Sequence, residues 1–158
     1  MNPEGSPITV HITQDCEDNA WDSFLSNSPR GQWEQTCAWA KVKQHDGWHP
    51  VRIILTADDR IIGGVMIIFR PKRYVGNIGF IWKGPVVLCD DKESLDLLVA
   101  AIKEIVRSYK IRVLFVQPPD RHPAMADLLK KKGFMANLVS WVIKRTTVHV
   151  DLRRNEDE

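Results

Sequence analysis

The chain has 158 residues, of which 44% are hydrophobic and 27% are charged. This balance is typical of a globular protein with a buried core, and the length suits one domain. We expect that domain over residues 1–152 and a frayed tail over residues 153–158, which has nothing apolar to bury. The formal net charge of +2 is too small to indicate a nucleic-acid-binding protein, although it excludes no partner.

Cysteine usage and apolar runs indicate the compartment. Cys16, Cys37 and Cys89 are widely spaced and form no C-x-x-C pair, so neither a disulfide framework nor a zinc site is indicated. The N-terminus has no basic start followed by an apolar run. The longest apolar stretch, residues 61–69, is far shorter than the roughly 20 residues that span a bilayer. The sequence therefore predicts a cytoplasmic protein without a transmembrane segment.

The first part of the chain predicts one strand and two helices. Residues 8–13 alternate apolar and polar side chains, as a half-buried strand does. Asp18 is placed to cap a short helix whose apolar residues share one face. A second helix follows within NSPRGQWEQTCAWAKVKQHDGW, residues 27–48, and is expected to end near Gly47.

This second helix carries an unusual set of side chains, because three of the six tryptophans fall within residues 27–48. Gln35, Trp39 and Lys43 recur at intervals of four, which on one α-helix places an amide, an indole and an ammonium in a single stripe. An indole beside an ammonium suits a polar, charged ligand, whereas aromatic residues at helical spacing more often belong to the core. The residues alone leave both interpretations open.

The middle of the chain predicts strands. Residues 48–56 and 61–69 are dense in β-branched side chains and are joined by ADDR, which suits a hairpin turn. Gly63 and Gly64 inside the second strand indicate a bulge or the close approach of another backbone. Residues 74–83 predict a further strand.

The remainder alternates helices and strands. Apolar residues from Leu95 to Tyr109 recur at spacings of three and four, which predicts a long amphipathic helix that Asp90 and Glu93 would cap as a pair. A strand over residues 111–117, a helix over residues 122–134 and one or two closing strands over residues 140–152 follow. The fold class is α/β in the mixed α+β sense: a central, mostly antiparallel mixed sheet flanked by helices.

The motifs of several large enzyme classes are absent, since there is no G-x-S-x-G elbow, P-loop or Rossmann fingerprint. His45 and His49 stand four apart, but Asp46 and Gly47 end the helix between them, so no metal is indicated. A basic cluster surrounds one turn between strands, where the side chains either are solvated or line a groove for phosphates. Its members are Arg70, Lys72, Arg73 and Lys83.

A series of motifs runs along the chain: SPRGQWEQTCAWAKVK, GPVV after a β segment, a strand that ends at Pro118, GF after a helix, and TTVHVDL. Together they resemble the N-terminal half of the Fem family (FemA, FemB and FemX-like). The resemblance runs from about Asp18 to Leu152. The Gln-x3-Trp-x3-Lys spacing, with Gly84 and Pro85, is its most specific part.

The resemblance implies a GNAT-like acyltransferase fold and an aminoacyltransferase activity. Such proteins add an amino acid from aminoacyl-tRNA to the stem peptide of a peptidoglycan precursor, which forms the interpeptide bridge. The resemblance implies aminoacyl-tRNA as co-substrate and no tightly bound cofactor. The other partner it implies is a lipid-linked or nucleotide-linked muropeptide, and a lipid-linked substrate brings peripheral contact with the inner face of the membrane.

The same resemblance suggests site residues. Lys43 would bind the anionic precursor as a point charge, and Trp39 and Gln35 would shape the same wall. We add Arg73 and Lys83 of the basic cluster as candidate substrate-binding residues. The resemblance assigns no catalytic residue to this half of a Fem protein.

The sequence departs from the family pattern at its end. A Fem protein continues beyond the segment matched by Thr147, Asp151 and Leu152 into a second GNAT-like half, whereas this chain stops at Glu158. We expect a fragment of a longer protein, or else a lone domain that has lost the transfer reaction. Half of the site is then missing, and the isolated chain is expected to be inactive.

Two other functions stay open. The first is a GNAT N-acyltransferase that uses acetyl-CoA, whose pyrophosphate needs a glycine-rich turn and a free helix N-terminus. The helix in question begins with Asp90, Asp91 and Glu93, and these carboxylates disfavour the cofactor on electrostatic grounds. The second is a non-catalytic GNAT-like module that binds a cell-wall precursor or a protein partner without turnover.

Overall fold

The computed structural model describes residues 7–120 and 122–136. The closing strands expected over residues 140–152, the tail over residues 153–158, and Thr147, Asp151 and Leu152 lie outside the described residues. Within the described part, no helix has both the length and the apolar character that crossing a membrane requires.

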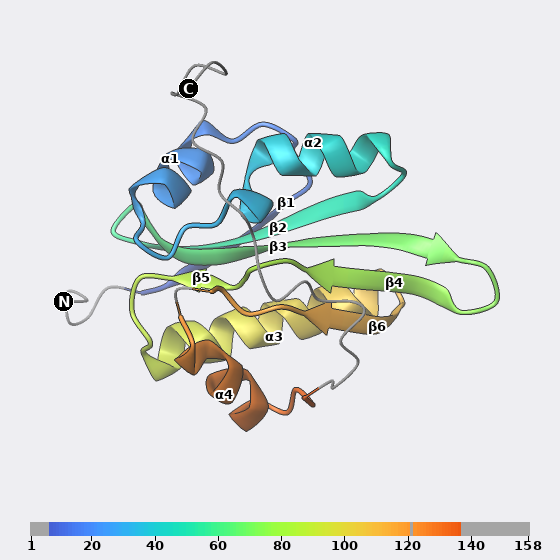
Figure 1. Ribbon diagram of the computed structural model, residues 1–158. Coiled ribbons are helices and arrows are strands. Elements are labelled where there is room, and N and C mark those ends of the chain that lie inside the picture. The colour runs from blue at the N-terminus through green and yellow to red at the C-terminus, as the bar shows by residue number, and fades with distance from the viewer. Residues whose placement is uncertain (1–6, 121, 137–158) are drawn as a thin grey trace, which may run out of the picture.

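The core of the molecule is one mixed sheet in the order β1-β2-β3-β4-β6, with the short β5 paired to β3 (Figure 1). Neighbouring strands are antiparallel except β4 and β6, which are parallel. The predicted mostly antiparallel mixed sheet is therefore confirmed. The strands are β1 (Thr9–Thr13), β2 (His49–Ala57), β3 (Arg60–Lys72), β4 (Gly76–Ile81), β5 (Val86–Val87) and β6 (Ile111–Val116).

Helices cover both faces of this sheet (Figure 1). One face carries α1 (Asn19–Asn27) and α2 (Cys37–His45), with the single 3-10 turn η1 (Trp33–Gln35) between them. The other face carries α3 (Lys92–Ser108) and α4 (Ala124–Lys131). We call these the α2 face and the α3 face.

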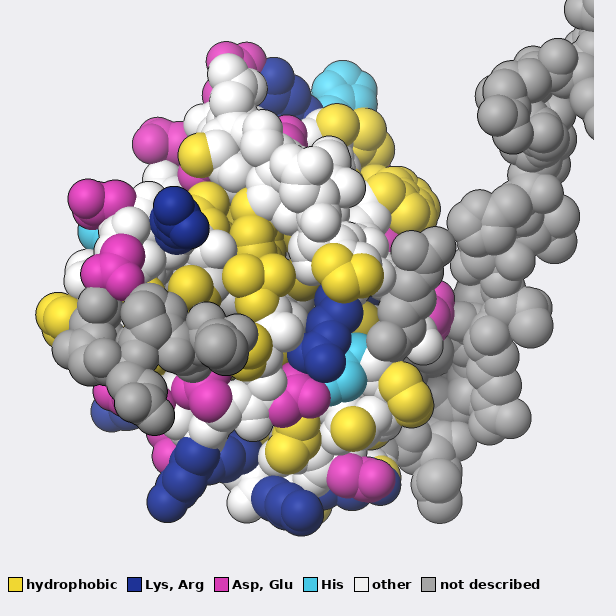
Figure 2. Space-filling model, turned by 90° about the vertical axis from the view of Figure 1, so that its left-hand side faces the viewer, with side chains coloured by type: hydrophobic (Ala, Val, Ile, Leu, Met, Phe, Trp, Pro, Cys, Tyr) yellow, Lys and Arg dark blue, Asp and Glu magenta, His cyan; other side chains and the backbone are white. Residues whose placement is uncertain are grey.

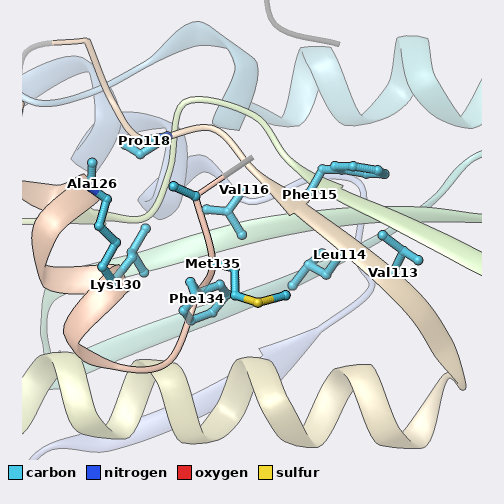
Figure 3. A pocket seen from close by; sticks show the side chains of 11 residues that line it. Val113, Leu114, Phe115, Val116, Pro118, Ala126, Lys130, Phe134 and Met135 are labelled. Carbon is cyan, nitrogen blue, oxygen red and sulfur yellow. The ribbon is translucent and has the colours of Figure 1, made fainter. Parts of the chain in front are cut away.

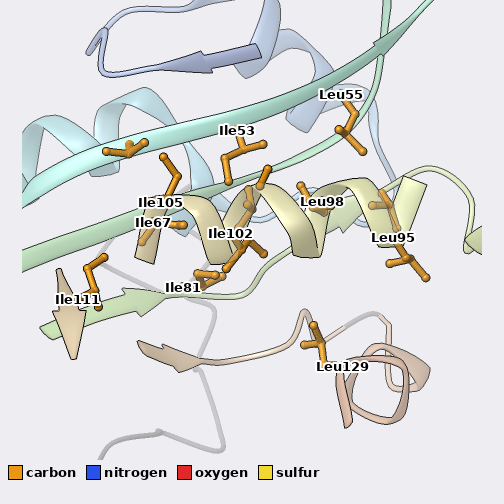
Figure 4. Close-up of a cluster of buried hydrophobic side chains, with 14 of the residues drawn as sticks. Ile53, Leu55, Ile67, Ile81, Leu95, Leu98, Ile102, Ile105, Ile111 and Leu129 are labelled. Carbon is orange, nitrogen blue, oxygen red and sulfur yellow. The ribbon is translucent and has the colours of Figure 1, made fainter. Parts of the chain in front are cut away.

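Alternation along the central strand separates the two cores. Val65 and Ile67 of β3 point to the α3 face, while Met66 and Ile68 point to the α2 face. On the α3 face, aliphatic side chains of α3 such as Leu98 pack against the sheet in one continuous cluster (Figure 4). The spacing of three and four between Leu95 and Tyr109 predicted this helix correctly.

The two adjacent glycines of β3 allow the close approach that their position predicted. Gly63 and Gly64 pair with Val87 and Val86 of β5. A Cβ atom at Gly64 would lie 2.4 Å from the carbonyl oxygen of Ile53 and 2.8 Å from the ring of Trp21. Any side chain at that position would therefore displace either the neighbouring strand or α1.

The tryptophan-rich segment forms two elements, and the prediction of one continuous helix is wrong. Thr36 separates η1 from α2 with an extended backbone, and its hydroxyl oxygen accepts a hydrogen bond from the Trp39 N–H as the cap of α2. Capping by Thr stops the helix from extending backwards. Gln35 therefore does not share a helix with Trp39 and Lys43, and the single stripe of three side chains does not exist.

The cap of α3 differs from the expected one by a single residue. The side chain of Asp91 accepts from the Ser94 N–H at 2.7 Å. Asp90, which was predicted to cap this helix, instead contacts Arg30 at 2.6 Å and the ring of His122 at 2.9 Å. Both partners are distant in sequence, so tertiary contacts decided which of two neighbouring aspartates became the cap.

Candidate functional site

The ammonium of Lys43 and the indoles of Trp33 and Trp39 lie close together on η1 and α2. Lys43 Nζ lies 4.4 Å from the centroid of the Trp39 ring, and the Trp33 and Trp39 rings meet edge to face at 4.7 Å. The predicted pairing of Trp39 with Lys43 on one helix face is therefore confirmed. Trp33 is 58% exposed, and Lys43 Nζ has one further charged neighbour, Asp46 at 3.6 Å.

Trp39 packs on the same small buried cluster as Trp48, Phe80 and Trp82, and we call the rings around this cluster the aromatic wall. Phe80 lies at its centre, stacked on the Trp82 ring at 5.2 Å and on the Phe115 ring at 5.0 Å. It also meets Trp48 edge to face at 5.5 Å. The wall consists of Trp33, Trp39, Trp48, Phe80, Trp82 and Phe115, most of them half-buried.

Two indole N–H groups of the wall have no partner. Trp39 Nε1 and Trp82 Nε1 are both buried and form no hydrogen bond within the described residues. An indole N–H in a protein interior usually finds an acceptor, because leaving it unpaired costs about 1–3 kcal/mol. Each is therefore a buried donor for which the described residues supply no acceptor.

Gln35 is a buried side chain that stabilises this wall through hydrogen bonds. Its side-chain Nε2 donates to the Trp82 carbonyl at 2.5 Å, and its Oε1 accepts from the Met66 N–H at 2.6 Å. The Gln35 carbonyl accepts from Trp21 Nε1 at 2.8 Å, and the residue is 0% exposed. Gly84 leaves room for it, since a Cβ atom there would lie 2.9 Å from Gln35 Nε2. The amide ties Trp82, which directly follows β4, to Met66 of β3.

Lys83 lies at the turn beside Gln35, with a buried side chain and a left-handed backbone (φ +51°). Its ammonium pairs with Asp120, which follows the carboxyl end of β6. Glu34 is electrostatically coupled to both residues. Burial raises the pKa of the Glu34 carboxyl above its ordinary value, against an opposing effect of Lys83, and one oxygen of this carboxyl is buried without a hydrogen-bond partner among the described residues.

Sequence reasoning missed Glu34 and Asp120. Glu34 lies within the tryptophan-rich segment that the motif search singled out, and Asp120 directly follows the Pro118–Pro119 break after a buried strand. Both positions could have been flagged as carboxylates next to a functional element, but their meeting at Lys83 depends on the tertiary structure.

Arg73 lies elsewhere. It belongs to the turn between β3 and β4, where its guanidinium sits 4.8 Å from the centroid of the Tyr74 ring. No contact between described residues joins Arg73 to the aromatic wall. Of the candidate residues, the structure thus brings Trp39 and Lys43 together, places Gln35 and Lys83 behind and beside the wall, and leaves Arg73 apart.

Of two cavities in the described part of the chain, the larger is lined in part by Phe115 of the aromatic wall. The larger, of about 520 Å³, runs along β6 between Val116, α4 and the segment of Phe134 and Met135 (Figure 3). The smaller, of about 350 Å³, is lined by side chains that include His49. Lys43 and Trp39 line neither cavity, and the expected role of Lys43 in binding the precursor stays a prediction.

The family of the chain follows from comparison with known sequences. The sequence profile of the FemAB family matches residues 16–127, which contain the aromatic wall, Lys43 and Lys83. This chain belongs to the FemAB family. The recognition that began with the Gln-x3-Trp-x3-Lys spacing is therefore confirmed.

This FemAB-family chain is similar to lipid II:glycine glycyltransferases. It is 28% identical over 159 aligned residues to the lipid II:glycine glycyltransferase of Staphylococcus aureus (strain MRSA252), and the strain bovine RF122 / ET3-1 protein gives the same identity. The alignment covers 94% of this chain but 37% of the relative. The chain thus spans a little more than a third of the length of these relatives.

Solved structures confirm the fold of this FemAB-family chain. The crystal structure of FemX superposes with a TM-score of 0.65 at 25% identity, over 78% of this chain and 31% of FemX. The aminoglycoside N-acetyltransferase AAC(6')-Iy superposes with a TM-score of 0.63 at 15% identity, over 96% of this chain and 99% of that enzyme. The expected GNAT-like acyltransferase fold is therefore confirmed.

Proposed function

We propose that this chain forms one half of an aminoacyltransferase that adds an amino acid to the stem peptide of a peptidoglycan precursor and so builds the interpeptide bridge. The observation that carries the proposal is the match to lipid II:glycine glycyltransferases over 94% of the chain. The Lys43 ammonium beside the Trp39 ring supports it, because this pair lies inside the matched region.

In the proposed reaction, a free amine of the stem peptide attacks the ester carbonyl of aminoacyl-tRNA. The new C–N bond replaces the C–O bond to the tRNA ribose, and the amine proton ends on the leaving oxygen. Such chemistry gains most from alignment of the two substrates and from charges fixed near the reacting atoms. No group of this chain needs to form a covalent intermediate.

Each candidate residue has a distinct proposed role. Lys43 contacts an anionic group of the precursor, and Trp39 lies under it and shapes the same wall. Gln35 holds the wall in shape through Trp82. Lys83, neutralised in part by its partner carboxylate, sets the charge at the adjacent turn.

The proposal also assigns a role to Arg73 and names the substrates. Arg73 binds phosphate of the precursor at a distance from the wall, which a lipid-linked or nucleotide-linked muropeptide is long enough to reach. Aminoacyl-tRNA is the co-substrate, and no tightly bound cofactor is required. We place the reaction in the cytoplasm, at the inner face of the membrane when the precursor is lipid-linked.

Replacement of Lys43 by alanine tests the binding role. We expect Lys43→Ala to weaken binding of a nucleotide-linked muropeptide about tenfold in a calorimetric titration, because one charge-assisted contact is lost. The circular dichroism spectrum should not change, since Lys43 lies outside the buried clusters and its ammonium contacts the Trp39 ring and the exposed Asp46 carboxylate.

The matched control is Lys41→Ala on the same helix. Lys41 is exposed and pairs with Glu17, away from the wall. Its replacement removes the same charge and should change the affinity less than twofold. Equal losses in both variants, or an unchanged affinity in Lys43→Ala, would contradict the assignment.

The acetyl-CoA alternative is tested by thermal stability. The N-terminus of α3 is occupied by its own Asp91 cap, and the adjacent Asp90 is held by Arg30. We expect no stabilisation when acetyl-CoA is added, whereas a ligand at 100 times its dissociation constant adds about 2.7 kcal/mol. Binding of the muropeptide without turnover, by the complete protein supplied with aminoacyl-tRNA, would instead support a non-catalytic module.

A further inference from the structure

The hairpin formed by β3 and β4 extends beyond the rest of the sheet (Figure 1). A turn over residues 73–75 closes it, with the Val75 N–H donating to the Lys72 carbonyl at 3.1 Å and Lys72 paired with Gly76. Tyr74 and Gly76 have positive φ angles of 66° and 94°. The backbone of the tip is thus fixed by a hydrogen-bonded turn, so its side chains are presented in a defined arrangement.

The side chains at this tip are apolar and exposed. Tyr74 is 91% exposed and Val75 is 48% exposed. An aromatic residue next to a β-branched residue at the end of a projecting hairpin contributes nothing to the core of the described domain. Such a pair gains free energy only when another surface covers it.

Basic residues surround the apolar tip. No acidic residue occurs in residues 70–76 or 109–113, and none of the cations of these two segments forms an ion pair among the described residues. The start of β6 lies beside the tip, since a Cβ atom at Gly76 would be 3.1 Å from Arg112 Cγ. The cations are Arg70, Lys72, Arg73, Lys110 and Arg112.

The opposite end of the molecule is different. Figure 2 views it from the side away from the hairpin and shows basic, acidic and hydrophobic side chains intermixed. At that end Arg30 and Asp90 are paired. The concentration of one sign of charge is therefore a local property of the hairpin and the start of β6.

We infer that the tip of the β3–β4 hairpin docks on the surface of an anionic lipid bilayer. Tyr74 and Val75 enter the headgroup region, and Lys72, Arg73, Lys110 and Arg112 face lipid phosphates. Tyr is favoured at membrane interfaces because its ring is apolar and its hydroxyl stays hydrated. Basic residues next to an anionic bilayer add attraction without needing a specific pocket.

This contact goes beyond the proposed transfer reaction and does not depend on it, because it involves the protein and the lipid directly. In the proposed function, the membrane is reached through a lipid-linked substrate that the aromatic wall and Arg73 hold, whereas here the hairpin tip contacts the bilayer itself. The hairpin would hold the domain at the bilayer whether or not a substrate is bound.

The side chains favour a bilayer over RNA as the partner. Proteins that bind single-stranded nucleic acid stack bases on open aromatic faces. The Tyr74 ring has the Arg73 guanidinium over it at 4.8 Å, and the Trp48 ring has the Arg70 guanidinium over it at 4.4 Å. Val75 offers no surface on which a base stacks.

Vesicle co-sedimentation tests the inference. We expect the chain to bind vesicles of phosphatidylcholine with roughly 30% phosphatidylglycerol at least tenfold more tightly than vesicles of phosphatidylcholine alone, in about 0.1 M salt. Lys72→Glu combined with Arg73→Glu should weaken that binding by at least about 25-fold, because each basic residue at the surface contributes about fivefold.

A charge-matched control separates the tip from the overall charge. Lys92→Glu combined with Lys131→Glu changes the net charge equally, at exposed positions of α3 and α4 that lie away from the hairpin. This control should bind the anionic vesicles within about threefold of the original chain. Equal losses in the two double variants, or no preference for anionic vesicles, would overturn the inference.

A second variant tests the apolar contribution. Tyr74→Ser combined with Val75→Ser should weaken binding about tenfold while the salt dependence is kept, because the cations remain. Circular dichroism checks that each variant is folded. Binding of a single-stranded RNA probe that depends on Lys72 and Arg73, with no binding to anionic vesicles, would overturn the inference in favour of RNA.

Discussion

The two faces of the sheet are built differently. The α3 face holds one continuous aliphatic cluster, to which β2, β3, α3 and α4 all contribute (Figure 4). The α2 face has two smaller clusters, and polar groups lie buried between its helices and the sheet. Arg52 is one of them, held by Asp18 at 3.1 Å and lying 3.1 Å from the Cys37 sulfur.

The difference shows how one small domain separates stability from recognition. Aliphatic packing on the α3 face is non-directional and contributes free energy roughly in proportion to buried area. Buried polar groups on the α2 face contribute less net free energy but fix geometry, because each hydrogen bond requires one arrangement. The face with the directional contacts is the face that carries Trp39 and Lys43.

The largest expected effect concerns the α3 face. Leu98 is 0% exposed at the centre of its cluster, and we expect Leu98→Ala to lower the free energy of unfolding by about 3 kcal/mol through lost burial and a residual cavity. Chemical denaturation measures the loss. Leu97→Ala, at a half-buried position one residue away, should cost about 1 kcal/mol.

If the faces are separate in role, Leu98→Ala should leave the affinity for a muropeptide unchanged at temperatures where the variant is folded. A loss of affinity comparable with that of Lys43→Ala would remove the distinction between the faces.

An intermediate effect is expected on the α2 face. Gln35→Leu leaves the Met66 N–H and the Trp82 carbonyl without partners, and we expect it to lower the free energy of unfolding by about 2 kcal/mol. It should also weaken muropeptide binding, although Gln35 is fully buried, because the position of Trp82 depends on it. Calorimetry and denaturation together measure both effects.

Gln32→Leu is the matched control for this prediction. Gln32 is half-buried and makes one long side-chain contact, 3.5 Å to the Arg30 carbonyl. Its replacement should change stability by less than about 0.5 kcal/mol and leave binding unchanged. A binding loss confined to Gln35→Leu sharpens the contrast, and an unchanged affinity in both variants argues against a structural role in the wall.

The smallest expected effect is a pH dependence on the α2 face. Because burial raises the pKa of Glu34, the folded protein holds this proton more tightly than the unfolded chain does. The resulting stabilisation is complete below the ordinary pKa of the carboxyl and is lost as pH rises through the raised pKa. Glu34→Gln should therefore show a smaller fall in melting temperature over this range, and an unchanged pH profile would contradict the prediction.

Sequence patterns predicted correctly those elements whose formation depends on residues close together in the chain. The spacing of apolar residues predicted α3, the β-branched runs around ADDR predicted the hairpin of β2 and β3, and Asp18 caps α1 as expected. The interval of four between Trp39 and Lys43 lies inside one helix, so their contact also followed from sequence.

The sequence by itself determined the order of the longer helices and strands, the mixed sheet and the adjacency of the indole and the ammonium, because periodicity and helical spacing act over a few residues. Only the tertiary structure decided that Gln35 turns inward, since its partners Met66 and Trp82 lie 31 and 47 residues away. The same holds for the meeting of Glu34, Lys83 and Asp120 and for the choice of Asp91 over Asp90 as a cap. A buried polar side chain stabilises the fold only where other groups form hydrogen bonds with it. Those partners can be backbone groups that are distant in sequence, so the spacing of residues along the chain does not identify them.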